Sequence, residues 1–158
     1  MSKHSKRSRW QSYVDDALVK TGQISKAAIH GVDGTRWASS PDFQVPVHHT
    51  YLIVRHPQLE SFPFPQVTRE QIEKLLASIT GDESLLRRDG IEVANHRFIY
   101  LRSDRGKSIY GRKGADAGVC IVKTRKAILI GTYSHGIQPA NCNSVMERLA
   151  DYLIQHDL

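Results

Sequence analysis

Apolar residues recur at helical spacing near the start of the chain. One face of the predicted helix carries Trp10, Tyr13, Val14, Ala17 and Leu18. Ser8 and Gln11 form the pattern of a capping box, and Gly22 is a typical residue at which a helix stops. The pattern therefore predicts a short helix that begins just after Ser8 and ends near Gly22.

The last segment of the chain has the most regular apolar stripe. Its members are Val145, Met146, Leu149, Tyr152 and Leu153, and Asn141 is the expected cap. A helix with one apolar face must pack on another layer, and the economical arrangement lays the first and last helices side by side across one face of a sheet. This arrangement would bring Tyr152 toward Trp10 and Tyr13.

The segments between these helices are mostly typical of strands. Residues 26–31 and 35–38 flank the turn signal Asp33-Gly34 and predict a hairpin that carries Trp37. After Gly90, short polar or glycine-bearing turns separate five further runs: residues 91–93, 97–102, 108–112, 119–124 and 127–133. Four of these runs follow one another too closely for helical crossovers, which predicts antiparallel pairing.

A middle helix and an unusual segment lie between the hairpin and the later strands. Thr68 and Gln71 form a second capping box, for a helix that ends near Gly81. The segment from about residue 45 to residue 66 fits neither periodicity and contains Phe62-Pro-Phe-Pro65. We interpret it as an atypical insertion in a single domain of residues 10–158, and a natural surface loop and a retained intron both remain open.

Composition narrows the class of protein. The 158 residues suit one domain, and no apolar stretch is long enough to span a membrane. Residues 1–9 form a basic extension without an apolar secretory core, so we expect a cytoplasmic protein. Cys120 lies in an apolar run, where a thiol usually packs as a small core residue, and we expect no disulfide with Cys142. The net charge of +6 favours nucleic acid, anionic lipid headgroups or an acidic protein surface.

The sequence contains no pattern that specifies catalysis or a cofactor. Its histidines and cysteines lack zinc-site spacing, and no nucleophile elbow is present. Gly106-Lys107-Ser108 resembles the end of a phosphate-binding loop, but Leu101 stands where that motif needs glycine, so we interpret it as a hairpin turn. We therefore predict a protein that is not an enzyme and that binds no metal or cofactor.

Two groups of residues remain as candidates for binding. Trp10, Tyr13, Trp37 and Tyr152 would line an aromatic groove suited to a proline-rich ligand, although periodicity alone favours a buried core cluster. The second group is a basic face on the later strands, because charges at alternate strand positions share a face. It comprises Arg97, Arg102, Arg105, Lys107, Arg112, Lys113, Lys123, Arg125 and Lys126. This face is either merely solvated or binds an acidic protein surface or phosphoinositides, and no RNA-binding signature accompanies it.

Three separated motifs together resemble the profilin family, especially its fungal and plant members. They are the segments at residues 10–16, 102–112 and 141–154, which read WQSYVDD, RSDRGKSIYGR and NCNSVMERLADYLI. The resemblance implies an α+β fold in which N- and C-terminal helices pack on one face of a central antiparallel sheet, with shorter helical segments on the other. It also implies a monomer at the actin-rich cell cortex that regulates actin polymerisation. Such a protein promotes nucleotide exchange on actin and delivers monomers through proline-rich partners such as formins.

The resemblance also assigns roles to individual residues. The positions that match the polyproline site are Trp10, Tyr13, Trp37, Tyr152 and Leu158. Those that match the actin site are Arg97, Arg102, Tyr110, Arg112, Asn143, Ser144, Glu147 and Arg148. The phosphoinositide candidates are Arg105, Lys107, Arg112, Lys113, Lys123, Arg125 and Lys126. The rival hypothesis is a basic scaffold that binds phosphoinositides or nucleic acid without actin, although nucleic acid is not an expected partner. The long extension and the insertion both depart from the family pattern.

Overall fold

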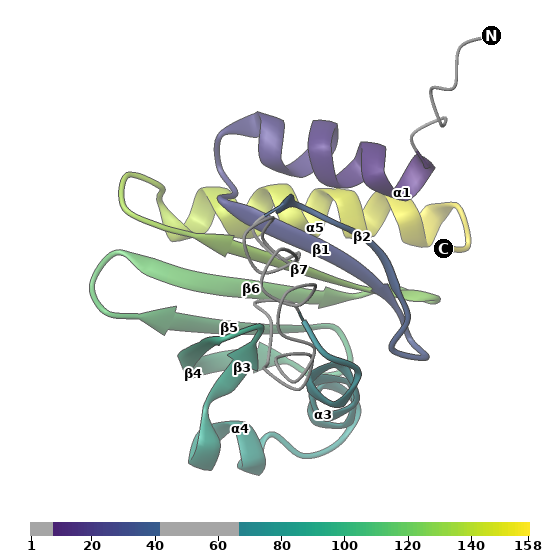
Figure 1. The fold of residues 1–158 in the computed structure, drawn as a ribbon. Helices are drawn as coiled ribbons and strands as arrows, with labels where there is room; N and C mark the ends of the chain where they lie inside the picture. The colour runs from purple at the N-terminus through teal and green to yellow at the C-terminus, as the bar shows by residue number, and fades with distance from the viewer. Residues whose placement is uncertain (1–7, 42–66) are drawn as a thin grey trace, which may run out of the picture.

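One antiparallel sheet forms the centre of the computed structural model, which describes residues 8–41 and 67–158 (Figure 1). Its strands, in the order β2-β1-β7-β6-β5-β4-β3, are neighbours through hydrogen bonds. Their bounds are β1 Lys26–Gly31, β2 Arg36–Ser39, β3 Ile91–Val93, β4 His96–Asp104, β5 Ser108–Lys113, β6 Ala117–Lys123 and β7 Ala127–Tyr133. The predicted hairpin, the five later strands and their antiparallel pairing are therefore confirmed.

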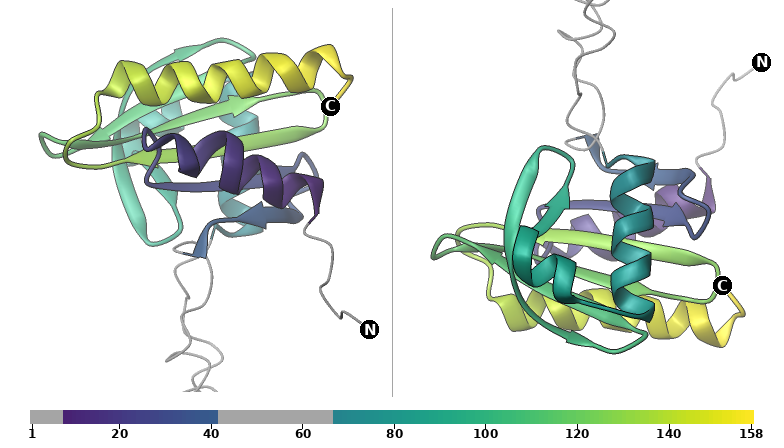
Figure 2. Two further views of the ribbon diagram at one scale, coloured as in Figure 1. Left: turned by 90° about the horizontal axis from the view of Figure 1, so that it is seen from above. Right: turned by 90° about the horizontal axis from the view of Figure 1, so that it is seen from below.

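The two faces of the sheet carry different helices (Figure 2). The first helix consists of α1 Arg9–Ser12, a π-helical turn η1 Tyr13–Leu18 and a 3₁₀ turn η2 Val19–Thr21, and it lies beside α5 Pro139–Gln155. The opposite face carries α3 Arg69–Thr80 and the short α4 Ser84–Asp89. The predicted α+β arrangement, with the terminal helices on one face, is confirmed.

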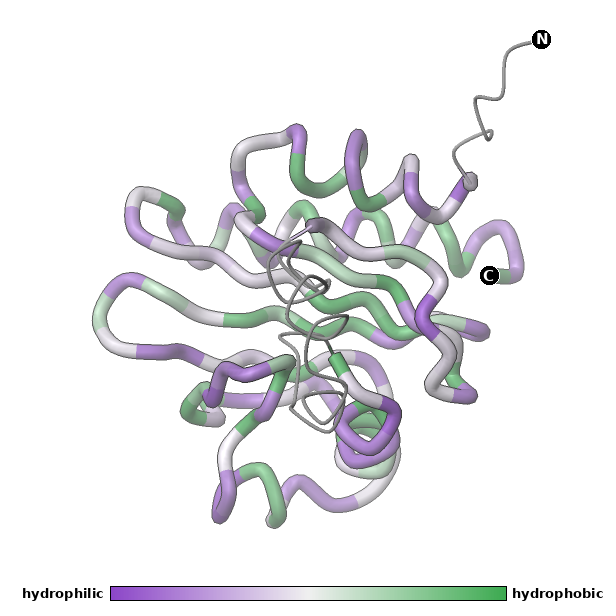
Figure 3. Tube along the Cα trace, in the orientation of Figure 1, coloured by the Kyte–Doolittle hydropathy of each residue, from purple (hydrophilic) through white to green (hydrophobic). Residues whose placement is uncertain are grey.

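Each face of the sheet has its own hydrophobic core. The core beneath the terminal helices includes Val14 and Leu18 of the first helix and Met146 and Leu153 of α5. The core beneath α3 and α4 includes Ile72, Leu75 and Leu86. It also includes the strand residues whose side chains point to this face of the sheet. Figure 3 shows apolar colour on the middle strands and mainly polar colour on the turns and outer helix faces. The strands are thus covered on both faces, as their nearly continuous apolar runs require.

The first helix is bounded as predicted, but its capping box is only half formed. The Ser8 hydroxyl accepts a hydrogen bond from the backbone N–H of Gln11 at 3.0 Å, and Gly22 ends the helix in a left-handed conformation. The Gln11 amide does not return to Ser8. It donates to Asp15 and to the backbone carbonyl of Ser39, each at 3.0 Å. Gln11 therefore fastens the first helix to β2.

The last helix begins earlier than predicted. Pro139 occupies its first position, where the missing N–H costs no hydrogen bond, and Gln138 is the residue before it. Asn141 lies inside the first turn, so its prediction as the cap is wrong. The stripe from Val145 to Leu153 faces the sheet or the first helix as expected.

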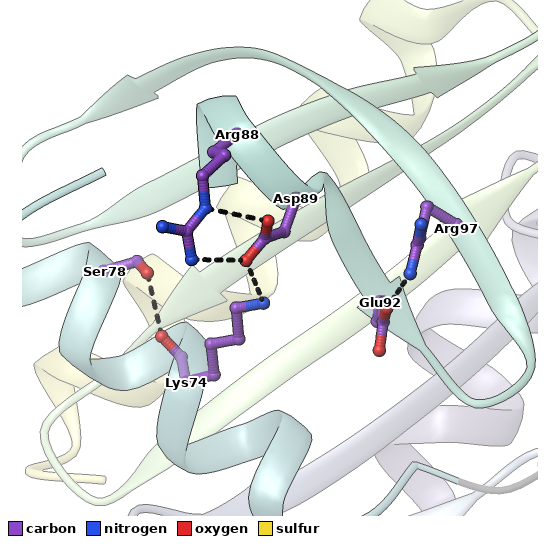
Figure 4. A network of polar contacts seen from close by, with 6 residues as sticks. All are labelled: Lys74, Ser78, Arg88, Asp89, Glu92 and Arg97. Carbon is purple, nitrogen blue, oxygen red and sulfur yellow. Dashed lines mark hydrogen bonds and ion pairs between the residues drawn. The ribbon is translucent and has the colours of Figure 1, made fainter. Parts of the chain in front are cut away.

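Polar contacts join the two helices of the opposite face (Figure 4). The capping box of Thr68 and Gln71 is complete at the start of α3. Asp89 at the end of α4 pairs with Lys74 of α3 at 3.5 Å and with Arg88 at 3.0 Å. The hydrophobic pattern did not predict α4, because its six residues bury only Leu86.

Two sequence interpretations concern segments outside the described residues. They are most of the basic extension at residues 1–9 and the insertion at about residues 45–66. In the part of the chain that the structure describes, no helix combines the length and apolar character needed to cross a bilayer.

Candidate functional site

Four aromatic rings from three separate elements form a continuous row. The ring centroids of Trp10 and Trp37 lie 4.6 Å apart, and those of Trp10 and Tyr13 lie 5.6 Å apart at an interplanar angle of 72°. Tyr13 in turn meets Tyr152 of α5 with centroids 6.2 Å apart. The predicted meeting of these rings at the junction of the terminal helices and the hairpin is confirmed.

The row is accessible from outside the protein. Trp10, Tyr13 and Trp37 are half-buried on the underlying core, whereas Tyr152 is 45% exposed. The rings therefore pack on the core without being closed to solvent, unlike the members of a fully buried cluster. The core holds the half-buried rings in place, and their exposed parts are open to contact from outside.

Gly31 of β1 provides the seat for the Trp37 ring. A side chain at this position would place its Cβ 2.7 Å from an atom of the Trp37 indole. The indole therefore lies directly on the strand backbone, where only glycine leaves space for it. This role is not apparent from the sequence, because a glycine at the end of a strand before a turn has a simpler explanation.

The end of the chain adjoins the aromatic row. Figures 1 and 2 place the end of α5 beside the start of the first helix. The ring of His156 lies 4.2 Å from the ring of Tyr152, and Leu158 is half-buried against the same core. His156 was not predicted as a site residue, although its position four residues after Tyr152 places both on one helical face.

The Tyr13 hydroxyl is suited to donate a hydrogen bond. Burial, and then the neighbouring Tyr152, raise the pKa of Tyr13 above its ordinary value. The phenol therefore keeps its proton at physiological pH. It can donate to a backbone carbonyl, which is the free polar group of a proline-rich chain.

A second candidate face is formed by β4 and β5, where a β-bulge changes the direction of the side chains. Tyr100 pairs with Gly111 and Arg102 pairs with Tyr110, so Leu101 is an extra residue between them. Strict alternation would place Arg97 and Arg102 on opposite faces of the sheet. The bulge brings both side chains to the face that carries α5, and no sequence pattern predicts it.

Tyr110 is the centre of a polar cluster on this face. The Arg102 guanidinium lies 4.0 Å from the centroid of the Tyr110 ring, and the Tyr110 hydroxyl donates to the Glu147 carboxylate. Ser108 donates to the same hydroxyl at 3.0 Å. Burial, and then the bond to Glu147, raise the pKa of Tyr110 to about 12. Tyr110 is only 4% exposed, and its contacts hold the side chains of Arg102 and Glu147 in position.

Exposed apolar side chains accompany the arginines of this face. Ile99 is 58% exposed and Leu101 is 50% exposed. Leu101 and Arg112 line a hollow of about 450 Å³ that continues to the loop before α5. Large apolar side chains exposed beside charged ones are typical of a protein interface rather than of a merely solvated face.

The four predicted actin residues of α5 do not share one side of the helix. Glu147 faces the cluster on β4 and β5, and Asn143 lies one turn before it on the same side. Ser144 is exposed. Arg148 lines a hollow between the first helix and α5, on the aromatic side. The structure therefore separates Arg148 from Asn143 and Glu147, whereas Ser144 lies one turn before Arg148 on the same side of the helix.

The phosphoinositide candidates lie at two ends of the sheet. The β4–β5 and β6–β7 turns bring five of them to one end: Arg105, Lys107, Lys123, Arg125 and Lys126. The backbone N–H of Lys123 donates to the carbonyl of Lys107 at 2.7 Å, which holds the two turns together. Arg112 and Lys113 lie at the other end of β5. The predicted basic face is therefore divided.

The thiols offer no reactive site. Cys120 and Cys142 are free and buried, and burial raises the pKa of both, to about 12 for Cys142. Within residues 8–41 and 67–158, no three side chains of His, Cys, Asp or Glu are grouped so that they could hold a metal ion.

Comparison with known proteins identifies the relatives of this fold. A family model described as Profilin matches residues 8–158. Profilin-2 of Acanthamoeba castellanii is 41% identical over 146 residues, which cover 92% of this chain and 95% of that protein. The structure of Acanthamoeba castellanii profilin IB matches with a TM-score of 0.75 and 38% identity over 94% of this chain and 99% of that one. Mouse profilin IIa, solved in complex with a double repeat from the FH1 domain of mDia1, shares the fold at a TM-score of 0.67 and 19% identity, over 96% of this chain and 100% of that one.

Proposed function

The chain belongs to the profilin family, and we propose that its two faces perform the two binding tasks of that family. It is an actin-binding regulator of polymerisation that also binds proline-rich ligands, and profilins act by binding rather than by catalysis. The observation that carries the proposal for this chain is the continuous, half-exposed row of Trp10, Trp37, Tyr13 and Tyr152.

The aromatic row is the proposed site for proline-rich ligands. A polyproline II segment is already extended, so it loses little conformational entropy when it binds. Its pyrrolidine rings pack on the half-buried rings of Trp10 and Trp37 and on the exposed ring of Tyr152. The Tyr13 phenol, which stays protonated, donates to a carbonyl that the ligand cannot satisfy internally. Leu158 supports this site from the end of the chain.

The face of β4, β5 and the adjoining side of α5 is the proposed actin site. Ile99 and Leu101 supply apolar contact, and Arg97, Arg102 and Arg112 supply charge. Asn143, Ser144 and Glu147 extend this face along α5. Contacts that favour an open nucleotide cleft in actin would shift actin toward that state, which accounts for faster nucleotide exchange by linkage.

The two proposed sites lie on different parts of the surface. The aromatic row is at the junction of the first helix, β2 and the end of α5, whereas Leu101 and Arg112 are beside the start of α5. One molecule can therefore hold actin and a proline-rich protein such as a formin together. This arrangement supports delivery of actin monomers to filament ends, and we place the protein in the actin-rich cytoplasmic cortex as a monomer.

One experiment tests both sites with the full chain. Polyproline binding is followed by tryptophan fluorescence, and binding of monomeric actin is followed in a separate titration. Trp10→Ala should abolish polyproline binding and retain actin binding. Leu101→Glu should abolish actin binding and retain polyproline binding, because both side chains are accessible. Failure of the wild-type protein to bind either ligand while folded would overturn the proposal. Leu101 is a better probe than Tyr110, because a charged substitution at the buried Tyr110 is expected to destabilise the whole protein.

Phosphoinositide headgroups are a second proposed ligand. The five cations at the β4–β5 and β6–β7 turns support this proposal. Two of them already form exposed ion pairs, Lys107 with Asp151 at 3.7 Å and Arg125 with Asp157 at 3.5 Å. Such pairs contribute little, so a phosphate can replace the carboxylate. Less of the Arg125→Gln variant than of the wild-type protein should sediment with phosphoinositide vesicles. Equal binding by the variant and the wild-type protein would contradict this assignment.

Family membership does not favour the rival hypothesis of a scaffold without actin binding.

A further inference from the structure

A hollow lies between the first helix and α5 and adjoins the aromatic row. It has a volume of about 330 Å³ and is lined by Tyr13, Ala17, Thr21, Val145, Arg148, Leu149 and Tyr152. Tyr13 and Tyr152 belong both to this hollow and to the aromatic row. A chain that leaves the row past these two rings therefore enters the hollow without turning away from the surface.

Arg148 distinguishes this hollow from the rest of the row. It is the only charged residue among the seven that line it. Among the described residues, none forms a hydrogen bond or an ion pair with its guanidinium. The nearby acid Asp151 pairs instead with Lys107. The guanidinium is therefore available to a carboxylate, which it can bind with two parallel hydrogen bonds.

The walls of the hollow explain why such a contact would be selective. Ala17 and Val145 are small or branched apolar residues, and Leu149 forms part of its buried floor. They offer apolar surface but no second charge. A neutral proline-rich chain gains only packing here, whereas a chain with a carboxylate gains packing and a charge-assisted bond to Arg148.

We propose that Arg148 selects proline-rich ligands that carry an acidic residue directly beside the proline run. This inference rests on the proposed proline-binding function and adds a specificity determinant to it. It also reassigns Arg148, which the family resemblance placed with the actin residues. The occupant is one peptide segment, with its prolines on the aromatic row and its carboxylate in the interhelical hollow.

The test compares three synthetic peptides of equal length with the full chain. One is a neutral proline run, and the other two carry a pair of glutamates at the N-terminal or the C-terminal end of the same run. We expect one acidic peptide to bind about two- to fivefold more tightly than the neutral one at low salt, as is typical of an exposed ion pair. The advantage should shrink as salt is added.

Variants identify the source of any such advantage. Arg148→Gln should remove the preference for the acidic peptide, and Arg148→Lys should retain part of it. Arg87→Gln removes the same charge from α4 on the opposite face of the sheet and should leave the preference intact. For each variant, the affinity for the acidic peptide is divided by the affinity for the neutral peptide. A general loss of stability would lower both affinities and would not change this ratio.

The outcomes separate this inference from the proposed function. Normal binding of the neutral peptide without a preference for either acidic peptide would overturn the role of Arg148 alone. A preference that survives in Arg148→Gln would also overturn it. Absence of binding to all three peptides would overturn the proline-binding function and this inference together.

Discussion

The indole rings of Trp10 and Trp37 lie 4.6 Å apart at an interplanar angle of 40°, although Trp10 belongs to the first helix and Trp37 to β2. The contact depends on the bare backbone of Gly31, on which the Trp37 ring rests. The aromatic row is therefore assembled by the hairpin as much as by the helices, and its geometry can be disturbed without removing any ring.

Gly31→Ala should weaken polyproline binding by displacing Trp37. The added methyl carbon would lie 2.7 Å from the indole, so the ring must move outward. Overpacking of this kind typically costs about 1–3 kcal/mol. We expect a loss of about tenfold in polyproline affinity, measured by tryptophan fluorescence, with actin affinity retained. Unchanged polyproline affinity would show that the position of Trp37 is not important.

Tyr110→Phe should weaken actin binding without removing any exposed contact. The substitution deletes the hydroxyl that donates to Glu147 and accepts from Ser108. A net loss of about 1 kcal/mol in the free energy of unfolding is expected, because a half-buried carboxylate loses a partner. The accompanying loss in actin affinity, measured by monomer titration, reports how far Glu147 and Arg102 depend on this anchor.

Tyr100→Phe is the matched control. The Tyr100 hydroxyl contacts the hydroxyl of Ser103 at 2.8 Å, on the opposite face of β4. This variant should have a similar cost in stability but no effect on actin affinity. Equal losses of actin affinity in both variants would assign the effect to general loosening of β4.

The sequence predicted most of the architecture because its signals are local. The capping box at Thr68, the turn at Asp33-Gly34 and the stripes of the terminal helices each depend on neighbouring residues, and all three were confirmed. The packing of the terminal helices followed from their apolar faces. The meeting of Trp10, Tyr13, Trp37 and Tyr152 then followed from that packing.

The parts that the sequence did not predict depend on contacts between distant segments. The bulge at Leu101 is set by pairing with β5 and decides which side chains join Arg102 on one face. The Gln11 side chain does not complete the capping box, because its amide donates to the Ser39 carbonyl of β2. Arg148 lines a hollow that residues of the first helix and of α5 form together. No local pattern encodes any of these relationships.

Gly118→Ala should destabilise the protein more than Gly131→Ala. At Gly118 the added Cβ would lie 2.2 Å from the Tyr133 hydroxyl and 2.6 Å from the backbone carbonyl of Gly111, which cannot move without breaking the sheet. At Gly131 it would meet the sulfur of Met146 at 2.5 Å. Methionine is flexible and can adapt.

Urea unfolding measures the difference between these two variants. We expect a loss of about 3 kcal/mol or more for Gly118→Ala and a smaller loss of about 1 kcal/mol for Gly131→Ala. If Gly118→Ala cannot be purified in a folded state, Gly131→Ala should still fold and bind both ligands. A greater loss in Gly131→Ala would contradict the expected adaptability of Met146.

The free energy of unfolding should decrease as the pH is lowered through the histidine range, because of His30. Its side chain is only 1% exposed in β1, and its Nδ1 lies 3.2 Å from the Gly34 carbonyl, whereas its Nε2 has no hydrogen-bond partner among residues 8–41 and 67–158. Burial lowers the pKa of His30, and Arg36 contributes in the same direction against the opposing bond to Gly34. The folded protein therefore holds this imidazole neutral at a pH where the unfolded chain protonates it.

The sign of the effect follows from proton binding. Below the ordinary histidine pKa of about 6.5, the unfolded state binds more protons at this position than the folded state, so the free energy of unfolding decreases as pH falls. Urea unfolding between about pH 7 and pH 5 should show this decrease, and its slope should be smaller in His30→Asn. His96, whose pKa is also lowered by burial, contributes in the same direction, so His96→Asn is the matched comparison. His30 is the more deeply buried of the two histidines, so we expect it to be the main source of the pH dependence. An equal or larger reduction of the slope in His96→Asn would contradict this expectation.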